Sequence, residues 1–322
     1  VESWIKFANS LKLRMAMRTC YVDGFEVDGK NSQKLAEEAV SHSVGVMTGV
    51  TDVAALLHHT DFSYRHPLFV IGPGEFDDTR MGATMDSYLN GYKDPRISSY
   101  FAISGNGDYT GIRTGIEINR DKYTTDDFSE LAISAETKLV WMNPAEVYFL
   151  RAEGALRGWN MNGTAKDLYE QGVRTSFEYL GVSGVDAYLA DGESVPAPYD
   201  DPANSGNNVD EGSSLLGKIT IKWDEEAGFE ENLERIITQK WIAIYPDGQE
   251  AWSEFRRTGY PKVFPVVVNN SGGTVNTNEQ VRRIPFPSTE YRDNAANVTA
   301  AVALLGGNDN GGTHLWWDKK NK

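Results

Sequence analysis

The strongest structural constraint in the sequence is a pair of helical patterns separated by a very short link. The first covers residues 144–157, with Asn143 as its N-cap, a proline at its first position and Gly158 after its end. Glu146 at the third position is expected to complete a capping-box-like pair with Asn143. The second helix is predicted over 164–180. Two helices joined by a tight turn form a helical hairpin of tetratricopeptide-like size.

Apolar residues at three- and four-residue spacing predict further helices over 4–18, 32–43, 232–245 and 251–258. Residues 61–125 and 183–214 are rich in Gly, Pro, Ser, Asp and Asn, which predicts long loops. Short strands are predicted over 263–268 and 281–286. The expected fold class is therefore mainly α-helical, with long loops on a tetratricopeptide-like scaffold and minor short strands.

Charge and cysteine content exclude several classes of protein. The chain has 31 Lys and Arg against 46 Asp and Glu, a net charge of −15. Nucleic-acid binding depends mainly on cationic contacts to phosphate, so it is not expected, and electrostatic docking to an anionic membrane is disfavoured. The single cysteine, Cys20, allows neither an intrachain disulfide nor a cysteine-based zinc site.

The sequence contains no strong signature of catalysis, of a metal site or of a cofactor. It has no nucleophile elbow and no phosphate-binding loop of the Walker type. Glu146 and Glu153 share one helix face and could form a glycosidase pair, but capping by Glu146 and pairing of Glu153 with Arg157 or with another helix are favoured. Residues 307–311 could hold calcium, although a simple turn is favoured. The histidines show no metal-ligand spacing and are His42, His58, His59, His66 and His314.

Aromatic residues among glycines and polar residues are the best candidates for ligand binding. Flat rings with hydrogen-bonding neighbours suit stacking on a sugar ring. The predicted ligand-binding set is Tyr88, Tyr92, Tyr100 and Tyr109, with Arg113 as a polar partner. Tyr109 would project from the glycine-rich turn over 105–111. Ordinary anchoring of loops explains each single tyrosine equally well.

Eight segments, in this order along the chain, resemble the SusD/RagB family of Bacteroidetes outer-membrane lipoproteins. They are WIKFANSLKLR (Trp4–Arg14), DPR (Asp94–Arg96), NPAEVYFLRAE (Asn143–Glu153), TQKWIA (Thr238–Ala243), EAW (Glu250–Trp252), RRTGYP (Arg256–Pro261), RRIPFP (Arg282–Pro287) and WWD (Trp316–Asp318). The resemblance spans nearly the whole chain. The motifs resemble scaffold more than ligand contacts, so they indicate the family and not the ligand.

The resemblance implies a helical fold with a ligand face made of long loops, and no catalysis. Proteins of this family sit at the cell outer membrane on its extracellular face, held by a lipid anchor. They cap a SusC-like TonB-dependent transporter, capture oligosaccharides or in some cases peptides, and close the ligand in. The chain opens at Val1 inside a helical pattern. Residues 1–322 are therefore expected to be the C-terminal portion of a single SusD-like domain, with the lipid-anchored part upstream.

Three hypotheses for the function follow. The leading one is a glycan-binding component of a SusC/SusD-type uptake complex that acts as a substrate-capturing lid. The alternatives are a peptide-binding RagB-like receptor and a structural lid of the transporter with little ligand affinity of its own. A helical glycoside hydrolase is disfavoured, because no catalytic constellation accompanies the paired glutamates.

Overall fold

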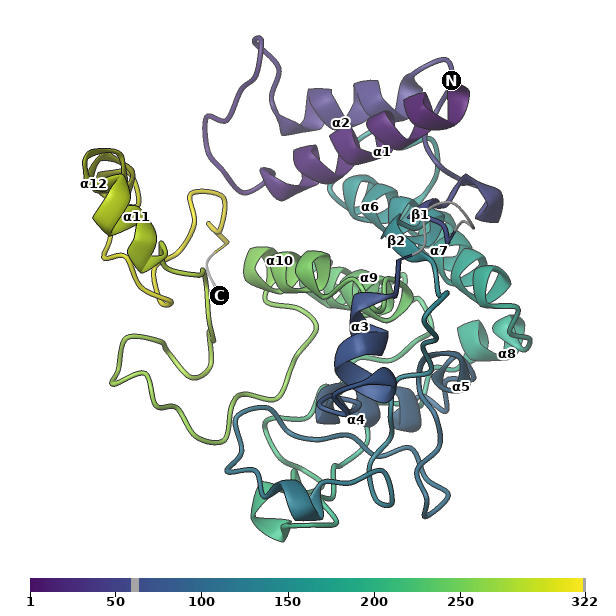
Figure 1. Ribbon diagram of the computed structural model, residues 1–322. Helices are drawn as coiled ribbons and strands as arrows, with labels where there is room; N and C mark the ends of the chain where they lie inside the picture. Colours follow the sequence, from purple (N-terminus) through teal and green to yellow (C-terminus); the bar gives the residue numbers. More distant parts are fainter. Residues whose placement is uncertain (59–63, 321–322) are drawn as a thin grey trace.

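The computed structural model describes residues 1–58 and 64–320, and it is mainly helical, as predicted (Figure 1). The α-helices are α1 (Glu2–Arg18), α2 (Ser32–Ser41), α3 (Pro67–Phe69), α4 (Ala83–Gly91), α5 (Ile97–Tyr100), α6 (Pro144–Leu156), α7 (Ala165–Leu180), α8 (Val185–Ala190), α9 (Phe229–Ala243), α10 (Gly248–Thr258), α11 (Ser288–Asp293) and α12 (Ala295–Ala303). The strands are β1 (Ala54–Leu56) and β2 (Leu139–Met142). No helix in these residues is long and apolar enough to cross a membrane.

The predicted helical hairpin is α6 with α7, and α6 lies between α1 and α9 (Figure 1). Asn143 caps α6, accepting a hydrogen bond from the backbone N–H of Ala145 at 2.9 Å. Thr164 caps α7 through the N–H of Asp167 at 3.1 Å. The helix α6 also packs against α9 and α1, and α1 packs against α2. Apolar side chains from all of these helices form one continuous core.

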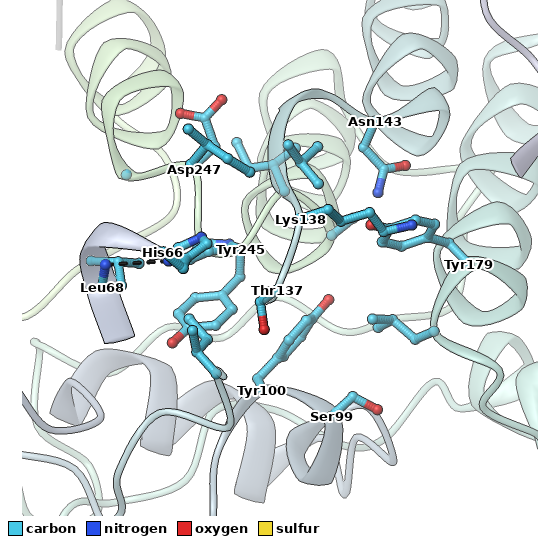
Figure 2. Close-up of a pocket in the computed structure, with 18 of the residues that line it drawn as sticks. His66, Leu68, Ser99, Tyr100, Thr137, Lys138, Asn143, Tyr179, Tyr245 and Asp247 are labelled. Atoms are coloured by element: carbon cyan, nitrogen blue, oxygen red, sulfur yellow. Dashed lines mark hydrogen bonds between the residues drawn. The ribbon is translucent and has the colours of Figure 1, made fainter. Parts of the chain in front are cut away.

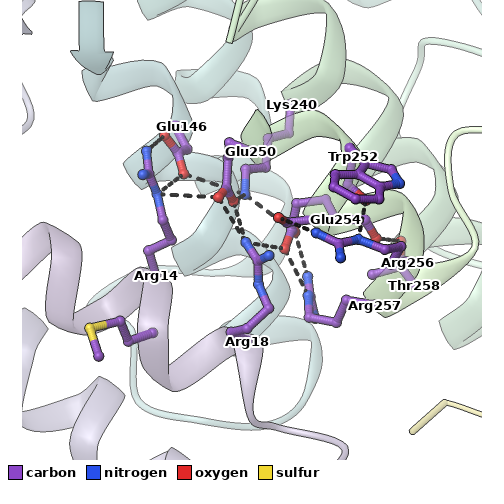
Figure 3. A network of polar contacts seen from close by, with 12 residues as sticks. Arg14, Arg18, Glu146, Lys240, Glu250, Trp252, Glu254, Arg256, Arg257 and Thr258 are labelled. Atoms are coloured by element: carbon purple, nitrogen blue, oxygen red, sulfur yellow. Dashed lines mark hydrogen bonds and ion pairs between the residues drawn. The ribbon is translucent and has the colours of Figure 1, made fainter. Parts of the chain in front are cut away.

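A buried network of charged side chains joins α1, α6, α9 and α10 (Figure 3). Its central cation is Lys240, whose Nζ lies 2.9 Å from Glu250, 3.2 Å from Glu254 and 3.4 Å from Glu146. Burial lowers the pKa of Lys240, but the three carboxylates outweigh this effect, so the pKa is raised. Arg18 of α1 also belongs to the network, because its guanidinium lies 2.7 Å from the carboxylate of Glu250. Helices from the start, the middle and the last third of the chain are therefore held together by shared charges.

The two glutamates of α6 belong to this charged layer. Glu146 does not have the predicted capping-box role: its carboxylate lies 2.5 Å from Arg14 of α1. Glu153 pairs with Arg157 on its own helix at 2.7 Å and with Arg257 of α10 at 2.5 Å, so both predicted pairings are confirmed. Each motif that contributes to this layer therefore serves the packing of helices against one another.

The predicted strands were wrong in position. The only strand pair among the described residues is the antiparallel pair of β1 and β2, with Ala54 opposite Met142. Residues 263–268 form only scattered backbone hydrogen bonds, such as the one from the N–H of Val268 to the carbonyl of Gly115 at 2.8 Å. Neither this segment nor 281–286 forms a strand. A run of apolar residues becomes a strand only where a second segment lies beside it over several residues, and neither predicted run has such a neighbour.

The predicted loops contain more helix than expected. Residues 61–125 include α3, α4 and α5, and residues 183–214 include α8. Asp94 and Arg96 fix the start of α5, because the Arg96 guanidinium lies 2.6 Å from Asp94 and also donates to Gln239 of α9 at 2.9 Å. Long-range contacts of this kind, rather than local propensity, keep these short helices folded.

Candidate ligand-binding cavity

A cavity of about 380 Å³ opens where the loop segment before α6 meets the link between α9 and α10 (Figure 2). Its walls come from the start of α3, the end of α5, residues 132–143 and the last turn of α7. Its volume lies within the range of roughly 300–1,000 Å³ that is typical of small-molecule sites. Segments that are far apart in sequence therefore form one concave surface.

Three tyrosines line this cavity, and they are Tyr100, Tyr179 and Tyr245. The rings of Tyr100 and Tyr245 lie with their centroids 4.9 Å apart and their planes inclined by 55°. Lys138 places its Nζ 4.7 Å from the centre of the Tyr179 ring. In Figure 2, Tyr100, Thr137 and Tyr179 converge on the same space. Rings from three different elements thus give the cavity apolar faces with hydroxyl groups at their edges.

Burial shifts the pKa values of the phenols in this cavity upward. Desolvation raises the pKa of Tyr100 to about 12, although Arg96 opposes the shift. Desolvation also raises the pKa of Tyr245, whose buried hydroxyl has no hydrogen-bond partner among the described residues. Both phenols are therefore neutral at physiological pH. A neutral phenol can donate a hydrogen bond to a ligand oxygen.

Polar groups also line the cavity. Asp247 caps α10 by accepting from the N–H of Glu250 at 3.1 Å, and burial raises the pKa of its carboxyl group. His66 caps α3 through its Nδ1, which accepts from the N–H of Leu68 at 3.2 Å, and burial lowers the pKa of the imidazole. Rings and hydrogen-bonding groups in one hollow can bind a ligand with apolar faces and polar edges, such as a sugar.

The structure divides the predicted ligand-binding residues among different environments. Only Tyr100 lines the cavity, and 4% of its surface is exposed. Tyr88 and Tyr92 lie in the core, where their hydroxyls donate to the carbonyls of Lys262 at 3.2 Å and Ile219 at 2.8 Å. The expectation that Tyr88 and Tyr100 lie in loops was wrong, because they belong to α4 and α5. The core rings are covered by protein atoms and offer no face to a ligand in this conformation.

The remaining two predicted residues lie outside the cavity. Tyr109 is partly buried against the core, and its backbone carbonyl accepts from the side chain of Asn90 at 2.8 Å. Arg113 lines a separate cleft near α4. The role of the five residues in ligand binding stays a prediction, and the structure places no more than one of them in the tyrosine-lined cavity.

Sequence reasoning missed Tyr179 and Tyr245 as site residues because both fall inside clear helical patterns. Tyr179 lies in the last turn of α7, and Tyr245 directly follows α9 and its C-cap Ile244. A side chain at the end of a helix can lie at the edge of the packed interior and face a cavity more easily than one in the middle of the helix. The signal that could have found them is an aromatic residue one or two positions before a helix-ending Gly or Pro, which here are Gly181 and Pro246.

The structure also places the groups that were weighed as catalytic or metal-binding. Glu146 and Glu153 are engaged by cations in the buried charged layer. Asp309, in the segment considered for calcium, pairs with Arg283 and accepts from Tyr291 at 2.6 Å. Within 1–58 and 64–320, no group of three or more His, Cys, Asp or Glu residues is arranged to hold a metal ion. His59 lies outside the described residues.

Several solved structures are similar to this chain over almost its full length. A chitin-binding SusD homolog from Flavobacterium johnsoniae is 45% identical, with a TM-score of 0.90, and the match covers 99% of this chain and 64% of that one. A SusD homolog from Bacteroides uniformis is 46% identical, with a TM-score of 0.90 and coverages of 99% and 65%. One from Bacteroides thetaiotaomicron is 42% identical, with a TM-score of 0.89 and coverages of 99% and 66%.

The chain thus spans about two thirds of the length of these structures. No curated protein matches it. The family model for SusD-like proteins, described as Susd and RagB outer membrane lipoprotein, matches residues 1–318. With the eight motifs and the helical architecture in agreement, the chain belongs to the SusD-like family of outer-membrane lipoproteins.

Proposed function

We propose that this chain is the ligand-capturing part of a glycan-binding SusD-type receptor and that it performs no chemistry on its ligand. The observation that carries the proposal is the match to the chitin-binding homolog, which is 45% identical over 99% of this chain. This homolog is the one among the similar structures reported above whose description names a ligand, so its ligand class is the first to try. Chitin-derived oligosaccharides are therefore the first ligands to test.

The tyrosine-lined cavity supports this proposal on physical grounds. A sugar ring has apolar C–H faces and a polar rim, so it needs flat rings together with hydrogen-bonding groups. Tyr100, Tyr179 and Tyr245 provide rings, while Asn143, Lys138 and Asp247 provide donors and acceptors around them. The engagement of Glu146 and Glu153 in ion pairs is consistent with binding rather than hydrolysis.

We further propose that the complete protein works as a lid on a SusC-like TonB-dependent transporter. In this proposal it is lipid-anchored at the extracellular face of the outer membrane, and 1–322 is the C-terminal portion of its single domain. The family description supports a lipid-anchored protein of the outer membrane, and the coverage of about two thirds of the related structures supports a complete protein longer than this chain.

Affinity electrophoresis against a panel of polysaccharides, with a panel of peptides in parallel, tests the proposed function. We expect at least one glycan in the gel to retard this protein, with glycol chitin as the first candidate. Bovine serum albumin, run in the same gel as the control protein, should not be retarded. Binding to peptides alone would favour a RagB-like receptor. Binding to neither class, together with co-purification with the transporter, would favour a structural lid and contradict the glycan proposal.

A further inference from the structure

A second cleft, separate from the tyrosine-lined cavity, is lined by three arginines. Its volume is about 430 Å³, and the cations are Arg80, Arg113 and Arg120. Ile118, of which 62% is exposed, gives the cleft an apolar surface. Three guanidinium groups around one hollow are unusual in a chain whose net charge is −15. Asp77 and Asp78 also line the cleft, so its charged side chains are three cations and two carboxylates, a small positive excess in an acidic chain.

Two of the three arginines have carboxylate partners. Arg80 lies 2.7 Å from Asp77 and 4.0 Å from Glu130. Arg120 is 3.9 Å from Asp78, and its side chain is 82% exposed. The aspartates of both pairs are more than half exposed, so water weakens the attraction between the charges, although the Arg80 side chain itself is only 8% exposed.

Arg113 is the exception, because no carboxylate among the described residues pairs with it. Only 8% of its surface is exposed. Its guanidinium donates to two backbone carbonyls, of Pro265 at 2.8 Å and of Asn207 at 3.3 Å, and it lies 5.6 Å from the centre of the Phe264 ring. Its Nε has no hydrogen-bond partner. Burial lowers the pKa of this guanidinium, although Tyr199 opposes the shift.

A buried cation without an anion is costly, because it loses its hydration and gains no opposite charge in return. The carbonyls and the ring compensate for part of this cost. The Nε of Arg80 also has no partner, so two guanidinium groups at the same cleft each retain an unused donor.

We propose that this cleft binds the carboxylate of an acidic sugar, a uronic acid, with Arg113 as the principal anion-binding residue. The planar fork of a guanidinium matches a carboxylate with two parallel hydrogen bonds. Ile118 offers an apolar surface for the face of the same sugar ring, and Arg120 lies at the entrance. The sugar part of this ligand rests on the proposed glycan-binding function, whereas the anion-binding part rests on the arginines alone.

Calorimetric titration with trigalacturonate and with its fully methyl-esterified form tests the proposal, because the two ligands differ in charge while their rings are the same. We expect the acid to bind the unmodified chain about tenfold more tightly, or better, since hydrogen bonds to charged groups are the strong ones. Arg113→Gln and Arg120→Gln should each reduce this preference, with the larger loss for Arg113→Gln. Arg292→Gln is the matched control, because this arginine on α11 is exposed, lies outside the cleft and pairs with the adjacent Asp293.

Equal affinity for the acid and the ester would overturn the proposal, as would a preference for the acid that survives in both cleft variants. Thermal melting with sodium galacturonate, compared with galactose plus sodium chloride, separates this result from failure of the proposed function. Stabilisation by galacturonate that is lost in Arg113→Gln would support the cleft even if no polysaccharide bound. Binding of neutral glycans without any preference for the acid would leave the proposed function intact and refute the cleft alone.

Discussion

At the scale of single residues, the most informative side chains are buried charges. Arg257 has no exposed surface, and its guanidinium bridges Glu153 of α6 and Glu254 of α10 at 2.5 and 2.6 Å. Burial alone would raise the pKa of Glu153, but Arg257 and Arg157 outweigh it and lower the pKa. The motif residues thus depend on one another, since each buried charge requires its partner.

Replacing Arg257 with alanine should strongly destabilise the fold. The change leaves Glu153 and Glu254 buried with a cation missing, and breaking a buried pair in this way costs about 3–5 kcal/mol of the free energy of unfolding. Urea denaturation followed by circular dichroism measures the loss. Arg292→Ala, which removes an exposed ion pair, should leave stability unchanged. Equal stability of the two variants would show that the buried pairs do not hold the helices together.

The same carboxylates predict how stability depends on pH. Burial raises the pKa values of Glu250 and Glu254, but Lys240, Arg18 and, for Glu254, Arg257 outweigh it, so both values lie below the ordinary 4.5. A pKa that is lower in the folded state means that stability is fully present above pH 4.5 and is lost as pH falls through the folded-state values. Urea midpoints measured from neutral pH downward should therefore stay level and then drop in acid. A midpoint that rises on acidification would contradict this account.

At the scale of elements, the hairpin of α6 and α7 depends on close approach of the two helices. A Cβ atom at Gly172 of α7 would lie 2.8 Å from the ring of Phe149 on α6, and that ring is fully buried. Glycine at this position therefore serves packing, because it lets the ring lie directly on the backbone of the other helix.

Gly172→Ala should destabilise the chain even though alanine favours helix. We expect a loss of about 1–3 kcal/mol from overpacking, which exceeds the gain of about 1 kcal/mol in helix propensity. Gly248→Ala at the first position of α10 is the control, since a Cβ there would meet nothing within 4 Å. Thermal melting of both variants measures the difference. A Gly172→Ala variant as stable as the control would mean that the ring can move aside.

The same scale separates what the sequence predicts from what it does not. The ends of α6 and α7 were predictable because Asn143, Thr164 and Gly181 act on their own helix. The burial of Tyr88 was not, because its ring packs on Trp241 of α9 with centroids 5.5 Å apart, a contact between distant segments. Local chemistry marks where helices begin and end, while the tertiary fold decides which tyrosines reach a cavity.

At the scale of the whole molecule, the buried charged network and the tyrosine-lined cavity meet at α6. The network joins α1, α6, α9 and α10, and the cavity draws on loops and helix ends beside them (Figures 1 and 2), with Glu146 belonging to both. The rings of the cavity, however, lie outside the eight motifs, and they are Tyr100, Tyr179 and Tyr245. The motifs therefore identify the family and leave the ligand open.

The central claim is that the tyrosine-lined cavity binds a glycan, and calorimetric titration with a chitin oligosaccharide tests it most directly. The unmodified chain should bind, and Tyr179→Ala should lose about 1–3 kcal/mol of affinity, or about 5- to 150-fold, by analogy with stacking of other rings on aromatic side chains. Tyr291→Ala, a change at a half-exposed tyrosine on α11, should bind as the unmodified chain does. Binding that is equal in both variants, or absent from the unmodified chain, would contradict the account.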